Sequence, residues 1–324
     1  MNKFLDNKII IKTKELLKNK IFFNFLLCFL FFIFLTTTNS IVKHNIYETN
    51  DRSFFAITYA KITNIPAIKI NNDKISYVSY FKFYDYLDSF YKKQNIKTTP
   101  EAIKDQVMSK FIKNSILEKS AYKYNIKITD REVFDEIKKL NIQTGSIDVT
   151  ESIIKDNYNM SLEEFKKNFI KPIIIKNKLN SILSNDTKIN KDKIEKINNI
   201  YKQIKDSNNA ITTNKLGQKI DVFSTLAKEL SEDKVSAENY GDLGWISRDS
   251  MEESMKNAVF ALQKDQYSNV IKTSNGYHII KLLDIINTID IPKVRIAHIF
   301  IKSMDADTYL QKEIKTASIK EYIR

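Results

Sequence analysis

Glycine is rare in this chain, and its placement constrains the fold more than any other feature of the sequence. Only five glycines occur among 324 residues, and three of them, Gly241, Gly244 and Gly276, fall in one short stretch. The only tryptophan, Trp245, and one of the three histidines, His278, lie in the same stretch. Because glycine serves positions that need positive φ or close backbone approach, we expect a compact domain here. Elsewhere the scarcity of glycine and proline disfavours an all-β chain.

The residues around these glycines follow a definite order. A helix is expected at 223–230, ending in Ser-Glu-Asp at 231–233. The string Gly-Asp-Leu-Gly-Trp at 241–245 comes next, followed by a helix at 251–262 that contains Phe-Ala-Leu. Two strands then flank an Asn-Gly turn, the second beginning Gly-Tyr-His-Ile-Ile at 276–280.

This order and spacing are closely similar to the parvulin family of peptidyl-prolyl isomerases. The resemblance implies an FKBP-like domain with a small antiparallel sheet, and hence an α+β chain. The family's first strand, which carries a second active-site histidine, is absent from residues 186–222. A matching string, Val-Arg-Ile-Ala-His-Ile-Phe-Ile, stands instead at 294–301. Too few residues follow for a second repeat, so we favour a circularly permuted domain at 206–324 whose first strand is supplied by 294–301.

The resemblance also implies the residues of the site. The catalytic residues would be His278, His298 and Asp233, and the substrate-binding residues would be Leu243, Met251, Met255, Asn275 and Thr273. The two histidines would lie on adjacent strands, tuned by Asn275 or Thr273, and would orient the substrate without transferring a proton.

Prolyl isomerisation needs no cofactor and no metal. Rotation about the peptide bond must overcome a barrier of about 18–20 kcal/mol that amide resonance creates. An apolar pocket favours the twisted transition state, which has less charge separation than the planar amide. One cysteine and three histidines in the whole chain also exclude a disulfide framework and a cysteine-based zinc site.

The amino end predicts export. Residues 1–20 carry six lysines and two carboxylates and form a basic, cytoplasmic segment. An apolar run over 21–42 follows, which is long enough to cross the hydrocarbon core of a bilayer as a transmembrane signal anchor. A cleaved signal peptide is the alternative, although no clear cleavage site is present. The rest of the chain would then lie outside the cytoplasm, beginning with a polar stalk at 43–65.

The segment 66–205 is expected to be a mostly helical domain. A short hairpin at 66–77 precedes a helix capped by Ser76, and capping-box patterns begin at Thr129 and Ser161. Pro172 is expected to kink the long helix that ends near residue 183. Over 66–185 this pattern resembles the amino-terminal chaperone domain of SurA-like and PrsA-like envelope foldases.

The charge of +13 does not indicate nucleic-acid binding, because only five of the 52 basic residues are arginine. We therefore expect a membrane-anchored, extracytoplasmic isomerase and chaperone whose partners are unfolded or proline-containing exported polypeptides. The alternatives are a non-catalytic holdase, whose parvulin-like domain only binds peptides, and a scaffold protein of the envelope.

Overall fold

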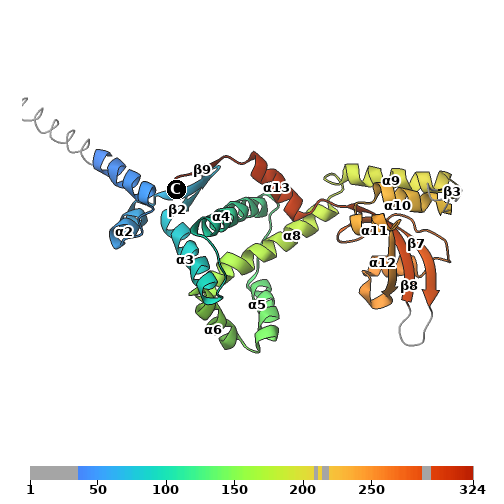
Figure 1. Ribbon diagram of the computed structural model, residues 1–324, viewed down its shortest axis with the longest axis horizontal. Coiled ribbons are helices and arrows are strands. Elements are labelled where there is room, and N and C mark those ends of the chain that lie inside the picture. The colour runs from blue at the N-terminus through green and yellow to red at the C-terminus, as the bar shows by residue number, and fades with distance from the viewer. Residues whose placement is uncertain (1–35, 208–210, 214–218, 287–292, 324) are drawn as a thin grey trace, which may run out of the picture. The chain divides into compact units, whose positions relative to one another are not determined.

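The computed structural model describes residues 36–207, 211–213, 219–286 and 293–323, which form two compact units. Of the described residues, 36–112 and 317–323 belong to the first unit, and those within 113–316 belong to the second. Figure 1 labels the elements along the chain. Most of the proposed span 21–42 lies outside the described residues. Within the described ones, no helix has both the length and the apolar character to cross a membrane.

The first unit combines helices with a three-stranded sheet. Residues 36–49 are helical. The other elements of this unit are α2 (Phe54–Thr63), β1 (Pro66–Ile70), β2 (Asp73–Ser76), α3 (Tyr77–Lys93), the start of α4 (Pro100–Lys123) and β9 (Ile319–Glu321). The predicted hairpin is confirmed as β1 and β2, and the Ser76 hydroxyl accepts from the Ser79 N–H as the N-cap of α3.

Two expectations for this unit need correction. The segment 43–65 is part of the first unit and not a separate polar stalk, because it holds the end of the helix 36–49 and all of α2. The final strand does not complete the parvulin-like domain. Instead β9 pairs antiparallel with β1, in the sheet order β2-β1-β9. The hydroxyl of Tyr47 also donates to the Pro66 carbonyl, which ties the helix 36–49 to this sheet.

The second unit begins with helices. Beyond the end of α4 these are α5 (Asp130–Thr144), α6 (Ile147–Tyr158), α7 (Leu162–Phe165), the π-helical turn η1 (Lys166–Ile170) and α8 (Lys171–Asn185). Both predicted capping boxes form, at Thr129 and at Ser161. At Pro172, where a kink was expected, the helix has a π-turn just before the proline, which accommodates a residue without an N–H.

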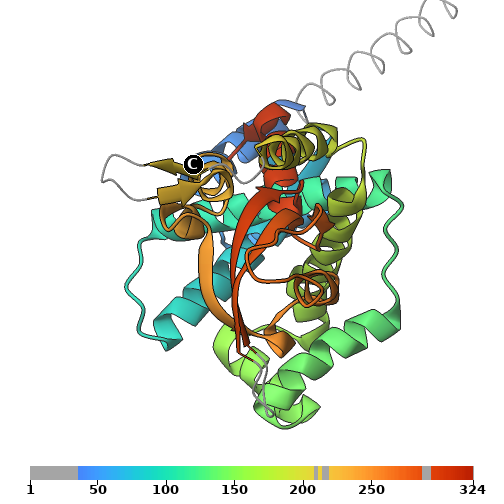
Figure 2. The same cartoon turned by 90° about the vertical axis from the view of Figure 1, so that its right-hand side faces the viewer.

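A four-stranded antiparallel sheet organises the rest of this unit. The elements of this part of the unit are α9 (Lys191–Asp206), β3 (Ile211–Thr213), β4 (Lys219–Asp221), α10 (Val222–Leu230), α11 (Lys234–Glu238), β5 (Asp242–Ser247), the 3-10 turn η2 (Arg248–Ser250), α12 (Glu253–Val259), β6 (Ile271–Lys272), β7 (Gly276–Ile286), β8 (Lys293–Lys302) and α13 (Ala306–Thr316). The sheet order is β5-β8-β7-β6, so β8 lies between the strands that carry the Gly-Trp and Gly-Tyr-His motifs (Figure 2).

The two faces of this sheet bury different clusters, because successive side chains of a strand point to opposite faces. On one face Ile279 and Ile299 pack against α9 and α10. On the other, Ile280 and Ile296 pack with Met251 and Val259, next to α12. Since His278 and His298 are two residues from Ile280 and Ile296, both histidines belong to the α12 face.

Candidate active site

The site is built on β7 and β8, which place two imidazoles side by side. In their antiparallel register His278 lies opposite Phe300 and Ile280 lies opposite His298, so the histidines are diagonal neighbours. Their Nδ1 atoms are 3.3 Å apart and both side chains are buried. The meeting of these rings is the arrangement that the resemblance implied.

A carboxylate reaches the histidine pair from the start of α11. Asp233 is the N-cap of this helix, and one of its oxygens lies 2.9 Å from Nε2 of His298. The hydroxyl of Ser236 donates to the same oxygen at 2.7 Å and lies 3.1 Å from the same ring nitrogen. Ser236 was not predicted, although its position three residues after the N-cap indicates a residue that could turn back to Asp233.

The opposite end of the pair is held by β6–β7. The hydroxyl of Thr273 lies 3.0 Å from Nε2 of His278. Of the two residues expected to tune the pair, Thr273 therefore contacts the ring, whereas Asn275 lies in the exposed turn and accepts from Ser303 through its carbonyl. Phe300 was also not predicted, and its ring lies 4.7 Å from that of His278.

Burial makes both imidazoles neutral at ordinary pH. Burial, with the neighbouring His298 and Lys272 as lesser causes, lowers the pKa of His278 to about 3. Burial also lowers the pKa of His298, although Asp233 acts against it. For Asp233 burial alone would raise the pKa, but hydrogen bonds from Ser236 and His298 outweigh burial and hold the pKa below its ordinary value.

With Asp233 ionised and both histidines neutral, the hydrogen bonds from Thr273 to Asp233 can run in only one direction. An ionised Asp233 can only accept, so Nε2 of His298 carries the hydrogen and its Nδ1 accepts. Nδ1–H of His278 then donates to His298, and Nε2 of His278 accepts from the Thr273 hydroxyl. The chain of donors thus runs from Thr273 to Asp233 and fixes both tautomers.

The three expected pocket residues lie together on the α12 face of the sheet, the face to which both histidines belong. Met251 is buried, and Leu243 and Met255 are partly buried against the same apolar cluster as Ile280. Gly241 allows the sheet to close here: a Cβ at this residue would lie 2.5 Å from the His298 carbonyl oxygen, and its φ is +85°. In the described part of the chain, no three His, Cys, Asp or Glu side chains are grouped so as to hold a metal ion.

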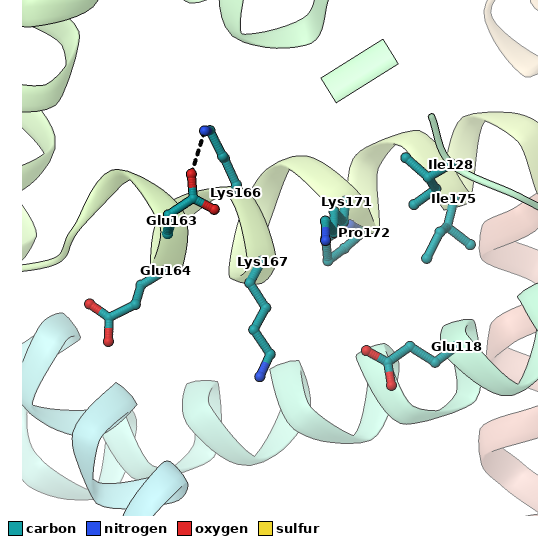
Figure 3. Close-up of a pocket in the computed structure, with 9 residues that line it drawn as sticks. All are labelled: Glu118, Ile128, Glu163, Glu164, Lys166, Lys167, Lys171, Pro172 and Ile175. Atoms are coloured by element: carbon teal, nitrogen blue, oxygen red, sulfur yellow. Dashed lines mark hydrogen bonds and ion pairs between the residues drawn. The ribbon is translucent and has the colours of Figure 1, made fainter. Parts of the chain in front are cut away.

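A separate cleft of about 520 Å³ lies among the helices of this unit. Figure 3 shows Ile128, Pro172 and Ile175 as its apolar part, with Glu118 on α4 and Lys167 on η1 extending into it. The remaining lining residues are Glu163, Glu164, Lys166 and Lys171. The π-turn therefore shapes one wall of the cleft.

Two family models match the chain. Residues 178–284 match the PPIC-type PPIase domain, and residues 17–179 match the SurA-like N-terminal domain. The second match spans half of the chain. The first ends before β8, so the strand bearing His298 lies outside the matched range.

Named relatives agree with both models. Foldase protein PrsA 2 of Bacillus cereus is 33% identical over 206 residues, covering 60% of this chain and 70% of that protein. Foldase protein PrsA 1 of the same organism is 30% identical over 231 residues, covering 68% and 78%. Periplasmic chaperone PpiD of Haemophilus influenzae is 36% identical over 101 residues, covering 31% and 16%.

Among solved structures, the peptidylprolyl isomerase PrsA from Bacillus cereus is similar over 75% of this chain and 80% of that one, at 21% identity and a TM-score of 0.23. The family assignment rests on the two family models and on the foldase relatives that are at least 30% identical. The chain belongs to the PrsA/SurA-like foldases, parvulin-type peptidyl-prolyl isomerases that carry a SurA-like N-terminal domain.

Proposed function

We propose that this protein catalyses prolyl isomerisation at the buried His278–His298 pair, in exported polypeptides, while anchored in the membrane by residues 21–42. The observation that carries the site assignment is the hydrogen-bonded series from Thr273 to Asp233 beside an apolar cluster. The names of the relatives support the location, since one is a periplasmic chaperone.

The proline ring would bind against Leu243, Met251 and Met255. Such a site excludes water from the prolyl peptide bond and so disfavours the planar amide, whose resonance separates charge. Two neutral imidazoles of fixed tautomer present a rigid polar surface at the edge of this pocket without placing a full charge in it. Asp233 acts through His298, because its carboxylate keeps the hydrogen on Nε2.

The position of β8 supports a permuted domain. The family's order has the histidine strand before the first helix, and here the matching strand follows the Gly-Tyr-His strand in sequence. β8 nevertheless lies between β5 and β7. We infer that the chain fills the family's first-strand position from the carboxyl side, which would place the catalytic domain at about 206–302, not 206–324.

The test is an assay of the full-length protein with a proline-containing peptide whose trans form alone is cleaved by a protease. His278→Ala should lower kcat/KM at least about tenfold, equivalent to 1.4 kcal/mol. His44→Ala, which removes the histidine outside this domain, should have no effect. Equal activity of His278→Ala and wild type would remove the histidine pair from the mechanism. No activity in the wild type would favour the non-catalytic holdase.

The cleft in Figure 3 favours a holding function in addition. Its apolar part and the charged side chains that line the rest of it suit an extended, unfolded segment with an apolar side chain. We propose that the helical domain, expected from the sequence at 66–205, retains unfolded client proteins in this cleft. The variant Lys167→Glu/Lys171→Glu should suppress aggregation of an unfolded acidic client less well than wild type. Lys138→Glu, on an exposed face of α5, serves as control.

A further inference from the structure

The helix α2 exposes large apolar side chains on one face. Phe54, Phe55 and Ile62 have exposed fractions of 88%, 66% and 79%. Ala56 and Ala60 are fully buried on the other face. At 100° per residue the three large side chains fall within an arc of about 100°, centred opposite the two alanines. Exposed apolar side chains gathered in this way mark an interaction surface.

The position of α2 in the first unit indicates what covers this face. The hydroxyl of Tyr59 donates to the backbone carbonyl of Asn39 at 3.1 Å, and it also bonds the Asn39 side chain. Asn39 lies near the carboxyl end of the apolar run 21–42. If residues 21–42 span the bilayer, the middle of α2 therefore lies at the level where the span leaves it. Phe55 is one helical turn before Tyr59, and Ile62 is one turn after it.

We propose that the Phe54–Phe55–Ile62 face of α2 lies on the surface of the bilayer that holds the anchor. This inference rests on the proposed anchor and adds a second contact with the same membrane. Aromatic and aliphatic side chains of an interfacial helix enter the boundary between headgroups and acyl chains. Lys61, exposed in the last turn, provides a charge for anionic headgroups.

Two contacts with the membrane restrict motion more than one. A single span leaves the attached domain free to rotate about the membrane normal and to tilt. A helix lying on the surface beside the span fixes the tilt, because Tyr59 joins the two. The first unit would thus have a defined face toward the lipid.

The experiment uses the full chain with Trp245→Phe as background, reconstituted in phosphatidylcholine–phosphatidylglycerol vesicles. Phe54→Trp and Ile62→Trp place a fluorophore on the face, and Ile96→Trp places one at an exposed position after α3 as a matched control. Lipids brominated near the acyl carbonyl should lower the emission of the first two about twofold and leave the third unchanged. An alkaline carbonate wash of the same vesicles tests the anchor separately.

Retention after the wash together with quenching at positions 54 and 62 supports the proposal. Retention without quenching at either position refutes it and leaves the anchor standing. Blue-shifted emission without quenching, with crosslinks between copies, would assign the face to a second copy of this chain and also refute it. Release by the wash would refute the anchor and, with it, this second membrane contact.

Discussion

Burial of the neutral histidine pair should make the catalytic domain sensitive to mild acid. The pKa of His278 is about 3 in the folded protein, against 6.5 for an ordinary histidine. Below 6.5 the unfolded chain therefore binds a proton that the folded site does not accept. The resulting stability is fully present above 6.5 and is lost as the pH falls through the window from 6.5 toward 3.

The magnitude follows from these two pKa values. Between pH 7 and pH 5, His278 alone should lower the free energy of unfolding by about 2 kcal/mol. The pKa of His298 is also lowered, so its contribution has the same sign. Asp233 contributes little over this interval, because its ordinary pKa of 3.8 lies below it.

Urea unfolding, followed by the fluorescence emission of Trp245, measures this loss of stability in the domain that holds His278. Trp245 is the only tryptophan, and its strand β5 pairs with β8 at Arg295. In His278→Asn the free energy of unfolding should change between pH 7 and pH 5 by about 2 kcal/mol less than in the wild type, whatever the stability of the variant at pH 7. His44→Asn should keep the full difference. A wild type of equal stability at both pH values would contradict the neutral, buried pair.

Three further predictions concern single residues. Gly276→Ala should cost about 2–4 kcal/mol of unfolding free energy in the same urea assay, because its Cβ would overlap the backbone carbonyl oxygen of Ile301 and lie 2.6 Å from the Phe300 ring. A loss below about 1 kcal/mol would show that the β7 and β8 backbones can move apart at this position. Asp221→Ala should lower the free energy of unfolding by about 2–3 kcal/mol, since it removes both the N-cap of α10 and the ion-pair partner of Lys281. Asp221→Asn should lower it less, because the amide oxygen retains the cap. Equal losses in the two variants would contradict the capping role. Met255→Ala should lower kcat/KM in isomerase assays, because the shortened side chain admits water to the apolar pocket, and an unchanged kcat/KM would remove Met255 from the proline pocket.

Local features of the fold were predictable because neighbouring residues determine them. Ser76, Thr129 and Ser161 begin helices through hydrogen bonds to residues three positions away. The break before Pro172 follows from its missing N–H. The pairing of β9 with β1 was not predictable in this way. It joins short segments some 250 residues apart in the sequence, and a three-residue strand has too little alternation to show a period.

The residues of the site also fall into two groups, those that a local motif predicts and those that only the fold brings together. His278 and His298 could be found because each lies in a family motif, and their meeting follows from adjacent strands. Ser236 and Phe300 belong to no motif that was used. Ser236 reaches His298 only because Asp233 starts a short helix beside β8, and Phe300 contacts His278 only in the observed strand register.

The pairing of β9 with β1 has a consequence for handling this protein. Residues 113–316 are flanked on both sides by chain that belongs to the first unit. The second unit, which holds α5 to α9 as well as the sheet with the histidine pair, is thus an insertion attached through two polypeptide connections. A single proteolytic nick between the units would leave it tethered by the other, and its release would require two cuts.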